Sequence, residues 1–92
     1  MWYVYAIQSL VRNYIYVGLT SNIDRRFEEH ETGKERTTKP YRPFRLILNE
    51  SFGTRAEARK REIKLKSGSG KEFLKRLART QTPEVFAVEV RL

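Results

Sequence analysis

The stretch YIYVGLTSNIDRRFEEH, residues 14–30, constrains the fold of this chain more than any other. Its first part alternates between two faces, as a strand with a buried side does. The residues on one face of this predicted strand are Tyr14, Tyr16 and Gly18. A helix follows, because Ser21 or Asn22 can cap a first turn that carries Asp24 at the positive end of the helix dipole. The sequence therefore brings tyrosines and cations together at one strand-to-helix junction.

The helix that begins at Ile23 sorts its charges by face, since residues three or four positions apart are neighbours. Ile23 and Phe27 form an apolar stripe. Arg26 and His30 border this stripe, whereas Arg25 points away from it. Helix geometry alone favours a structural role, in which Arg26 lays its aliphatic stem over the core and His30 packs at the edge. The alternative is that Arg26 is a guanidinium held beside the tyrosine strand for chemistry.

The charge of the chain points to a polyanionic partner. Nineteen lysines and arginines stand against eleven acidic residues, which gives a net charge of +8 and a sequence pI of about 10.1. Nucleic acid is the commonest such partner, and an anionic membrane surface is the next. The loop 33–43 carries the cations Lys34, Arg36, Lys39 and Arg42. This loop either follows a phosphate backbone or is a solvated connection, and its composition favours neither.

Composition excludes several kinds of site. The 92 residues contain no cysteine, which rules out a disulfide framework and thiolate chemistry. His30 is the only histidine, which rules out a multi-histidine zinc site. No run approaches the roughly 20 apolar residues that a membrane-spanning helix needs. Met1 leads directly into an alternating segment rather than a leader peptide, so we expect an intracellular, cytoplasmic protein without membrane attachment.

The rest of the chain predicts a small α+β domain. Alternation predicts strands at 2–8 and 44–52, and helical periodicity predicts helices at 54–66 and 71–79. The predicted order is strand, strand, helix, strand, helix, helix, with the first two strands as a hairpin. In the third strand, Phe44, Leu46 and Leu48 are expected on one face. The domain spans 1–80, and the tail 81–92 is either an additional edge strand or a loose arm.

The second predicted helix opens with a capping box formed by Thr54 and Glu57. One arc of this helix carries Arg55, Arg59, Glu62 and Lys66. Glu62, the acid of this arc, has two interpretations. It is either a partner in an exposed salt bridge, which contributes roughly 0.3–0.5 kcal/mol, or a carboxylate kept for a metal.

These residues form an ordered set along the chain. The set comprises Tyr3-Val4-Tyr5, Tyr16-Val17-Gly18 after ten residues, Arg26 and His30 on one helix, and Glu62 on a later helix. It resembles the GIY-YIG nuclease superfamily, and most of all the small bacterial members that consist of the nuclease domain alone. The resemblance covers residues 2–77. It implies the family fold, a three-stranded antiparallel sheet flanked by helices.

The resemblance also implies roles for individual residues. Tyr5 and Tyr16 are the motif tyrosines, and one of them, preferably Tyr16, helps to activate the attacking water. Arg26 binds the scissile phosphate, and His30 lies near the same phosphate. Glu62 is the carboxylate ligand of one divalent metal ion, Mg²⁺ or Mn²⁺.

The resulting hypothesis is a metal-dependent DNA endonuclease that acts in DNA repair or recombination. A chain this small has little room to read sequence, so we expect recognition of branched, flap or single-stranded DNA, or a protein partner that supplies specificity. The loop cations, with Arg59 and Lys66, are predicted to contact the nucleic acid. One alternative is a nucleic-acid-binding domain with the nuclease fold but little catalysis. Another is a domain whose basic surface binds an acidic protein.

Overall fold

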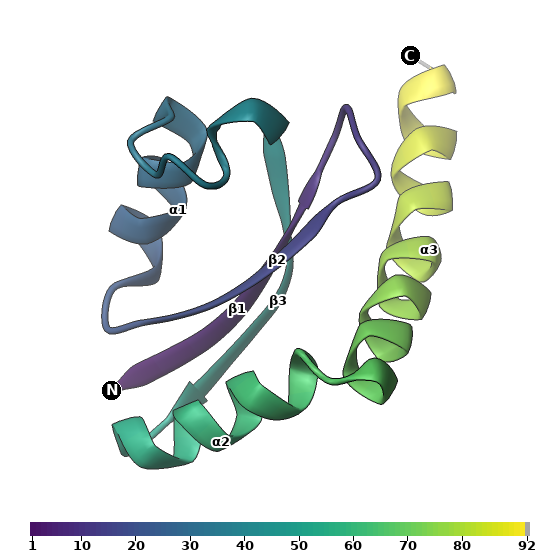
Figure 1. Cartoon of the computed structure of the whole chain (residues 1–92). Coiled ribbons are helices and arrows are strands. Elements are labelled where there is room, and N and C mark those ends of the chain that lie inside the picture. The colour runs from purple at the N-terminus through teal and green to yellow at the C-terminus, as the bar shows by residue number, and fades with distance from the viewer. Residues whose placement is uncertain (92) are drawn as a thin grey trace.

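The fold is organised around β1 (Trp2–Ser9), the central strand of an antiparallel sheet. The computed structural model describes residues 1–91, with side chains described through Gln81. In it, β1 lies between β2 (Ile15–Thr20) and β3 (Phe44–Phe52) (Figure 1). β1 and β2 form the predicted hairpin. The described chain thus contains the predicted three-stranded antiparallel sheet, in the order β2-β1-β3.

Helices cover both faces of this sheet, which is why β1 is buried along most of its length. On one face, Ile23 and Phe27 of α1 (Ile23–Thr32) pack against Tyr5 in an aromatic core. α2 (Arg55–Leu65) and α3 (Gly68–Arg91) cover the other face, where Leu65 and Leu74 join an aliphatic core (Figure 1). A short 3-10 helix, η1 (Lys39–Tyr41), precedes β3. The strand tyrosines therefore lie on the α1 side.

The starts of α1 and α2 form where the sequence predicts them. Oδ1 of Asn22 accepts a hydrogen bond of 3.0 Å from the backbone N–H of Arg25 at the start of α1. Gly33 ends α1 with φ of 82°, a left-handed conformation that glycine adopts without strain. Oγ1 of Thr54 accepts from the backbone N–H of Glu57 at 3.2 Å and so begins α2. The predicted element order and the α+β class are confirmed.

The third strand departs from simple alternation. Its pairing with β1 is irregular at Ile47, an extra residue between Leu46 and Leu48 that forms a β-bulge. The bulge places Ile47 in the core, whereas Leu46 is 40% exposed. The prediction that Phe44, Leu46 and Leu48 share one face is therefore wrong for Leu48, which packs against the aliphatic core whereas Phe44 lies in the aromatic core. Alternation in the sequence does not reveal an inserted residue.

The last helix is longer than the sequence predicts. α3 begins within the Ser-Gly-Ser-Gly segment and continues to Arg91. The alternative of an additional edge strand in the tail is wrong for residues 81–91, which are helical. Residue 92 lies outside the described part. Residues 71–82 contain neither glycine nor proline, so no helix-breaking residue ends the helix at Arg79.

Across residues 1–91, no helix combines the length and the apolar character that crossing a bilayer requires.

Candidate active site

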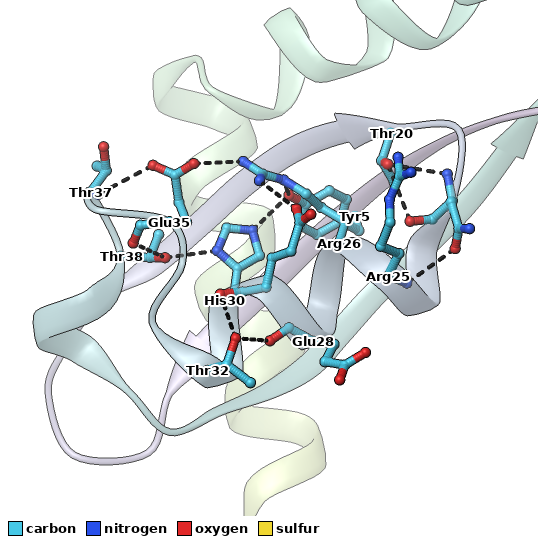
Figure 2. Close-up of polar contacts among 12 residues, drawn as sticks. Tyr5, Thr20, Arg25, Arg26, Glu28, His30, Thr32, Glu35, Thr37 and Thr38 are labelled. Carbon is cyan, nitrogen blue, oxygen red and sulfur yellow. Dashed lines mark hydrogen bonds and ion pairs between the residues drawn. The ribbon is translucent and has the colours of Figure 1, made fainter.

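Tyr5 lies at the centre of a buried polar network between β1 and α1. Its phenol oxygen is 2.8 Å from Nε2 of His30, and Nε of Arg26 donates a hydrogen bond to the same oxygen at 3.3 Å (Figure 2). Tyr5 and His30 are both fully buried. α1 presents Arg26 and His30 to the strand together because residues four apart share a helix face. A strand tyrosine and two helix side chains are thus in contact.

The hydrogen bonds around His30 define its tautomer. The Thr38 hydroxyl donates its proton to the carbonyl of Glu35, so it accepts from Nδ1–H of His30, and Nε2 is left to accept from the Tyr5 hydroxyl. Nδ1 then carries the ring proton and donates it to Oγ1 of Thr38, 2.7 Å away. The Thr38 hydroxyl donates in turn to the backbone carbonyl of Glu35 at 3.4 Å. We assign His30 as the Nδ1–H tautomer on the basis of this network.

Burial keeps both ring partners neutral. Removal from water raises the pKa of Tyr5 to about 12, against the opposing effect of the hydrogen bond from Arg26. Burial lowers the pKa of His30, and the positive charge of Arg26 lowers it further. At neutral pH Tyr5 is therefore a phenol and His30 an uncharged acceptor. In this state Tyr5 can orient its neighbours but is a poor base.

The Tyr5 ring occupies the space that a side chain at position 18 would need. Gly18 lies opposite Tyr5 in the β1–β2 pair. A Cβ added to Gly18 would overlap the Tyr5 hydroxyl and the ring carbon that bears it. Glycine is therefore needed here because of a close approach between strand and ring.

Two carboxylates hold the guanidinium of Arg26. Nη1 donates to Glu29 at 3.0 Å, and Nη2 donates to Glu35 at 2.9 Å. Burial acts to lower the pKa of Arg26, but these bonds and the one to Tyr5 outweigh it and raise the pKa above its usual value. The hydrogen bond from Arg26 lowers the pKa of Glu35. Arg25, by contrast, is exposed, as the helix periodicity predicts.

Tyr16 lies beside this network and is more accessible than Tyr5. Its ring centroid is 5.0 Å from that of His30 and 6.3 Å from that of Tyr5. Tyr16 is half-buried, and it lines a groove of about 530 Å³ together with Lys66 at the end of α2. Of the two motif tyrosines, Tyr16 is therefore the one that a bound molecule can reach.

Glu62 is linked to this groove through Lys66. Its carboxylate accepts a hydrogen bond from Arg59 at 2.6 Å and another from Lys66 at 3.3 Å. The predicted salt bridge is therefore present, but its expected exposure is wrong, because Glu62 is only 5% exposed. A helical wheel gives the direction of a side chain but does not show how far the neighbouring sheet covers it.

The donor chemistry at Glu62 fits a hard divalent cation. Mg²⁺ keeps several waters and needs one or two carboxylates, with further oxygens from substrate phosphates. The side chains of Arg59 and Lys66 are 61% and 51% exposed, so a bound phosphate can draw them away from the carboxylate. Among the residues whose side chains are described, no group of three or more acidic, histidine or cysteine side chains is placed to hold a metal. A metal at this position would therefore rely on a single carboxylate.

The predicted loop cations lie apart from the groove that Tyr16 lines. Lys39 and Arg42 line a separate, open hollow with Glu31, and the described residues lining the two cavities do not overlap. Lys34 and Arg36 are exposed. The structure thus brings together four of the predicted site residues, Tyr5, Tyr16, Arg26 and His30. Nucleic-acid contact by the loop cations stays a prediction.

Thr38, Glu35 and Glu29 belong to the network although the sequence does not single them out. Thr38 and Glu35 come from the loop 33–43, whose lack of periodicity gives no buried face to deduce. One signal is present for Glu35, because it is the single acid in a loop rich in cations. Glu29 is one of two adjacent glutamates on α1, and only its distance to Arg26 distinguishes it.

Comparisons with known proteins agree with this geometry. Residues 1–77 match the family model described as the GIY-YIG catalytic domain. The chain is 31% identical to a UPF0213 protein of Cupriavidus pinatubonensis, over 90% of this chain and 92% of that protein. It is 36% identical to a UPF0213 protein of Staphylococcus haemolyticus, over 79% and 89% of the two chains. The solution NMR structure of the UPF0213 protein BH0048 from Bacillus halodurans has a TM-score of 0.50 and 34% identity, covering 84% of this chain and 85% of that one.

Proposed function

We propose that this chain, which belongs to the family of GIY-YIG catalytic domains, is a metal-dependent endonuclease that hydrolyses phosphodiester bonds in DNA. One observation carries the proposal: a buried tyrosine, a neutral histidine and an oriented arginine form a single hydrogen-bonded network beside an accessible tyrosine. A merely structural arginine at the core edge does not need three side-chain partners.

Arg26 is proposed to bind the scissile phosphate. Hydrolysis adds a water oxygen to phosphorus and breaks one P–O ester bond, so negative charge builds up on the phosphate oxygens. A guanidinium already oriented by Tyr5 and Glu29 can stabilise this charge without reorganising. The substrate phosphate would take the place of the Glu35 carboxylate, which is the anion that Nη2 holds in this structure.

Tyr16 is the proposed residue for handling the proton of the attacking water. It is accessible from the groove, whereas burial raises the pKa of Tyr5 to about 12 and keeps that phenol protonated. His30 and Tyr5 then act together: Tyr5 donates to His30 and accepts from Arg26, which fixes the guanidinium at the phosphate position. Both residues have the same phenol group, so this division of roles rests on their different accessibility.

Glu62 is proposed to hold one Mg²⁺ or Mn²⁺ ion. When bound, the metal would neutralise charge on the phosphate and lower the pKa of coordinated water. Lys66 bonds to Glu62 and also lines the groove that contains Tyr16. Glu62 therefore lies close enough to the groove for its ion to meet a substrate there.

The proposed substrates are branched, flap or single-stranded DNA. The described chain has a basic surface but no separate element of a size to read sequence, and a protein partner would supply any further specificity. The test is to incubate the protein with each DNA structure, with Mg²⁺, Mn²⁺ or chelator, alongside the Arg26→Ala variant. Cleavage that requires metal and Arg26 supports the proposal. Absence of cleavage on every structure with either metal would overturn it.

A second candidate function is a nucleic-acid-binding domain with this fold and little catalysis. The observation that favours it is the saturation of Glu62, whose two carboxylate oxygens are held by Arg59 and Lys66. Such a domain would bind DNA less tightly as the salt concentration rises, because it contacts phosphates, but would cleave nothing at any metal concentration.

A further inference from the structure

A groove runs from Tyr16 along the junction of α2 and α3. It has a volume of about 530 Å³, and Tyr14, Ile15 and Tyr16 form one wall of it. In the described chain β2 pairs only with β1, so this wall is the open edge of the sheet and carries backbone groups without a strand partner. α3 stands alongside the β1–β2 hairpin (Figure 1). Tyr16 thus belongs both to this groove and to the candidate active site, where its ring lies 5.0 Å from that of His30.

The opposite wall of the groove is cationic. Lys66 comes from the end of α2, and Lys71 and Lys75 lie one turn apart on α3. The described residues that line the groove include no acid. Glu72 pairs with Lys75 at 3.9 Å, but both side chains are more than half exposed, and such a pair contributes at most about 1 kcal/mol. A phosphate can therefore compete with Glu72 for this lysine.

The size of the groove and the presence of Tyr16 indicate what the groove can hold. Its volume falls in the range of pockets that enclose a drug-sized ligand, about 300–1,000 Å³, and a double helix does not fit in such a space. The Tyr14 ring is already stacked on Tyr41, with 3.9 Å between the ring centroids, so Tyr16 is the residue of this wall that can offer a ring to an unpaired base. Unpaired backbone N–H groups at a strand edge can donate to phosphate oxygens.

We propose that this groove binds an unpaired nucleic-acid strand that continues from the phosphate at Arg26. Lys71 and Lys75 contact its phosphates, and Tyr16 stacks on a base. The inference rests on the proposed function, which makes nucleic acid the ligand, and goes beyond it by giving the path of the strand and its unpaired state. An acidic peptide would use the same lysines but would not need the ring of Tyr16.

The test compares two double variants by the binding of a fluorescent oligothymidine in chelator. Lys71→Ala with Lys75→Ala removes the cations of the groove. Lys60→Ala with Lys64→Ala removes two exposed lysines at the same spacing on α2 that do not line the groove. The groove variant should bind about tenfold or more weakly at low salt, with a slope of log affinity against log salt reduced by about 1.4, or about 0.7 for each phosphate contact.

The control variant should keep the wild-type slope, because it removes the same charge from a surface that the strand does not touch. An equal loss of oligothymidine affinity in the two double variants, or no loss of affinity in either, would overturn the inference. A bromouracil-containing oligonucleotide should crosslink within residues 14–16 or at Lys71, and crosslinks confined to 33–43 would also overturn it. Stronger competition by polyglutamate than by oligothymidine would favour the acidic-peptide occupant instead.

Binding in chelator is separate from cleavage, so the two proposals can fail independently. A wild-type protein that cleaves DNA while both double variants bind equally well would keep the nuclease and reject the groove. If the wild type cleaves nothing, but strand binding is lost only in the Lys71 and Lys75 double variant, the groove inference stands and the nuclease proposal is rejected.

Discussion

The hydroxyl oxygen of Tyr5 and Nε2 of His30 are 2.8 Å apart, on a strand and a helix that are separated by 25 positions in the chain. Both residues are fully buried, so this hydrogen bond fixes how α1 sits on the central strand. It also links the conformation of the loop 33–43 to the site, because Thr38 of that loop bonds to the other ring nitrogen of His30.

Thr38 should determine which ring nitrogen of His30 carries the proton. Thr38→Val removes the acceptor for Nδ1–H and leaves a buried donor without a partner, at a cost of about 1–3 kcal/mol in unfolding free energy. Because His30 is the only histidine, nitrogen NMR of the imidazole reports its tautomer directly. We expect Nδ1–H in the wild type and a shift toward Nε2–H in the valine variant.

The matched variant for this measurement is Thr38→Ser, which keeps the hydroxyl. It should keep the wild-type tautomer and the wild-type cleavage rate. If Thr38 only fills space, valine should be the better replacement, and serine should be the less stable of the two. An Nε2–H tautomer in the wild-type protein would contradict the hydrogen-bond assignment.

Stability should fall as the pH drops below about 6.5, the ordinary pKa of histidine. Burial and Arg26 lower the pKa of His30 in the folded protein, so the unfolded chain binds more protons in this range. The contribution of His30 to the unfolding free energy is therefore complete above pH 6.5. It decreases by up to about 1.4 kcal/mol per pH unit as the pH falls toward the lowered pKa. Denaturant unfolding between pH 7 and about pH 5, above the usual range of glutamate, should show this slope.

The control for the pH dependence is His30→Gln, which has no titrating ring. This variant should be less stable at pH 7, but its stability should be nearly constant over the same pH range. An equal slope in both proteins would assign the effect to other groups.

Periodicity explains how much of this molecule the sequence could predict. Alternation located the strands, and the capping residue Asn22 located the start of α1, because each signal depends on local backbone chemistry. The bulge at Ile47 depends on pairing with β1, which a single sequence does not show.

The same distinction holds for the candidate site. Helix spacing correctly placed Arg26 and His30 on one face and Arg25 on another. The burial of Glu62 and the contacts of Thr38 were not predictable, because they depend on how the sheet and the loop 33–43 close over these residues. Periodic elements were thus predictable, and the aperiodic loop was not.

Arg26 and Arg25 should differ sharply when each is replaced. Arg26→Ala should reduce single-turnover cleavage by a hundredfold or more, on the order of the loss of one donor that stabilises an oxyanion. Arg25→Ala, its exposed neighbour, should retain most of the activity. Arg26→Ala also exposes Glu29 and Glu35 to mutual repulsion, so circular dichroism must show that it is folded. Equal loss in the two variants would contradict the assignment of Arg26.

Glu62→Gln should separate the metal from the salt bridge. A neutral amide binds a hard cation far more weakly than a carboxylate, so metal-dependent cleavage should be lost. Stability should change by only about 0–1 kcal/mol, because the two cations left behind are largely exposed and are not stranded in the core. Binding of DNA in chelator should be unchanged or slightly tighter, since one negative charge is removed.

Metal binding at Glu62 can also be measured without an activity assay. Mn²⁺ should broaden NMR signals near Glu62 in the wild type and not in Glu62→Gln. A variant that keeps full cleavage would exclude Glu62 as the metal ligand and leave the salt bridge as its role.

The overlap that a side chain at position 18 would make with the Tyr5 ring has a consequence for the divergence of related sequences. Positions 5 and 18 are coupled: any larger residue at 18 selects against an aromatic ring at 5, and a smaller residue at 5 would relax the requirement for glycine. The two positions should therefore change together. A relative that has lost Gly18 is expected to have lost the phenol as well, and with it the network around Arg26. The glycine can thus serve as a marker for which relatives retain the site.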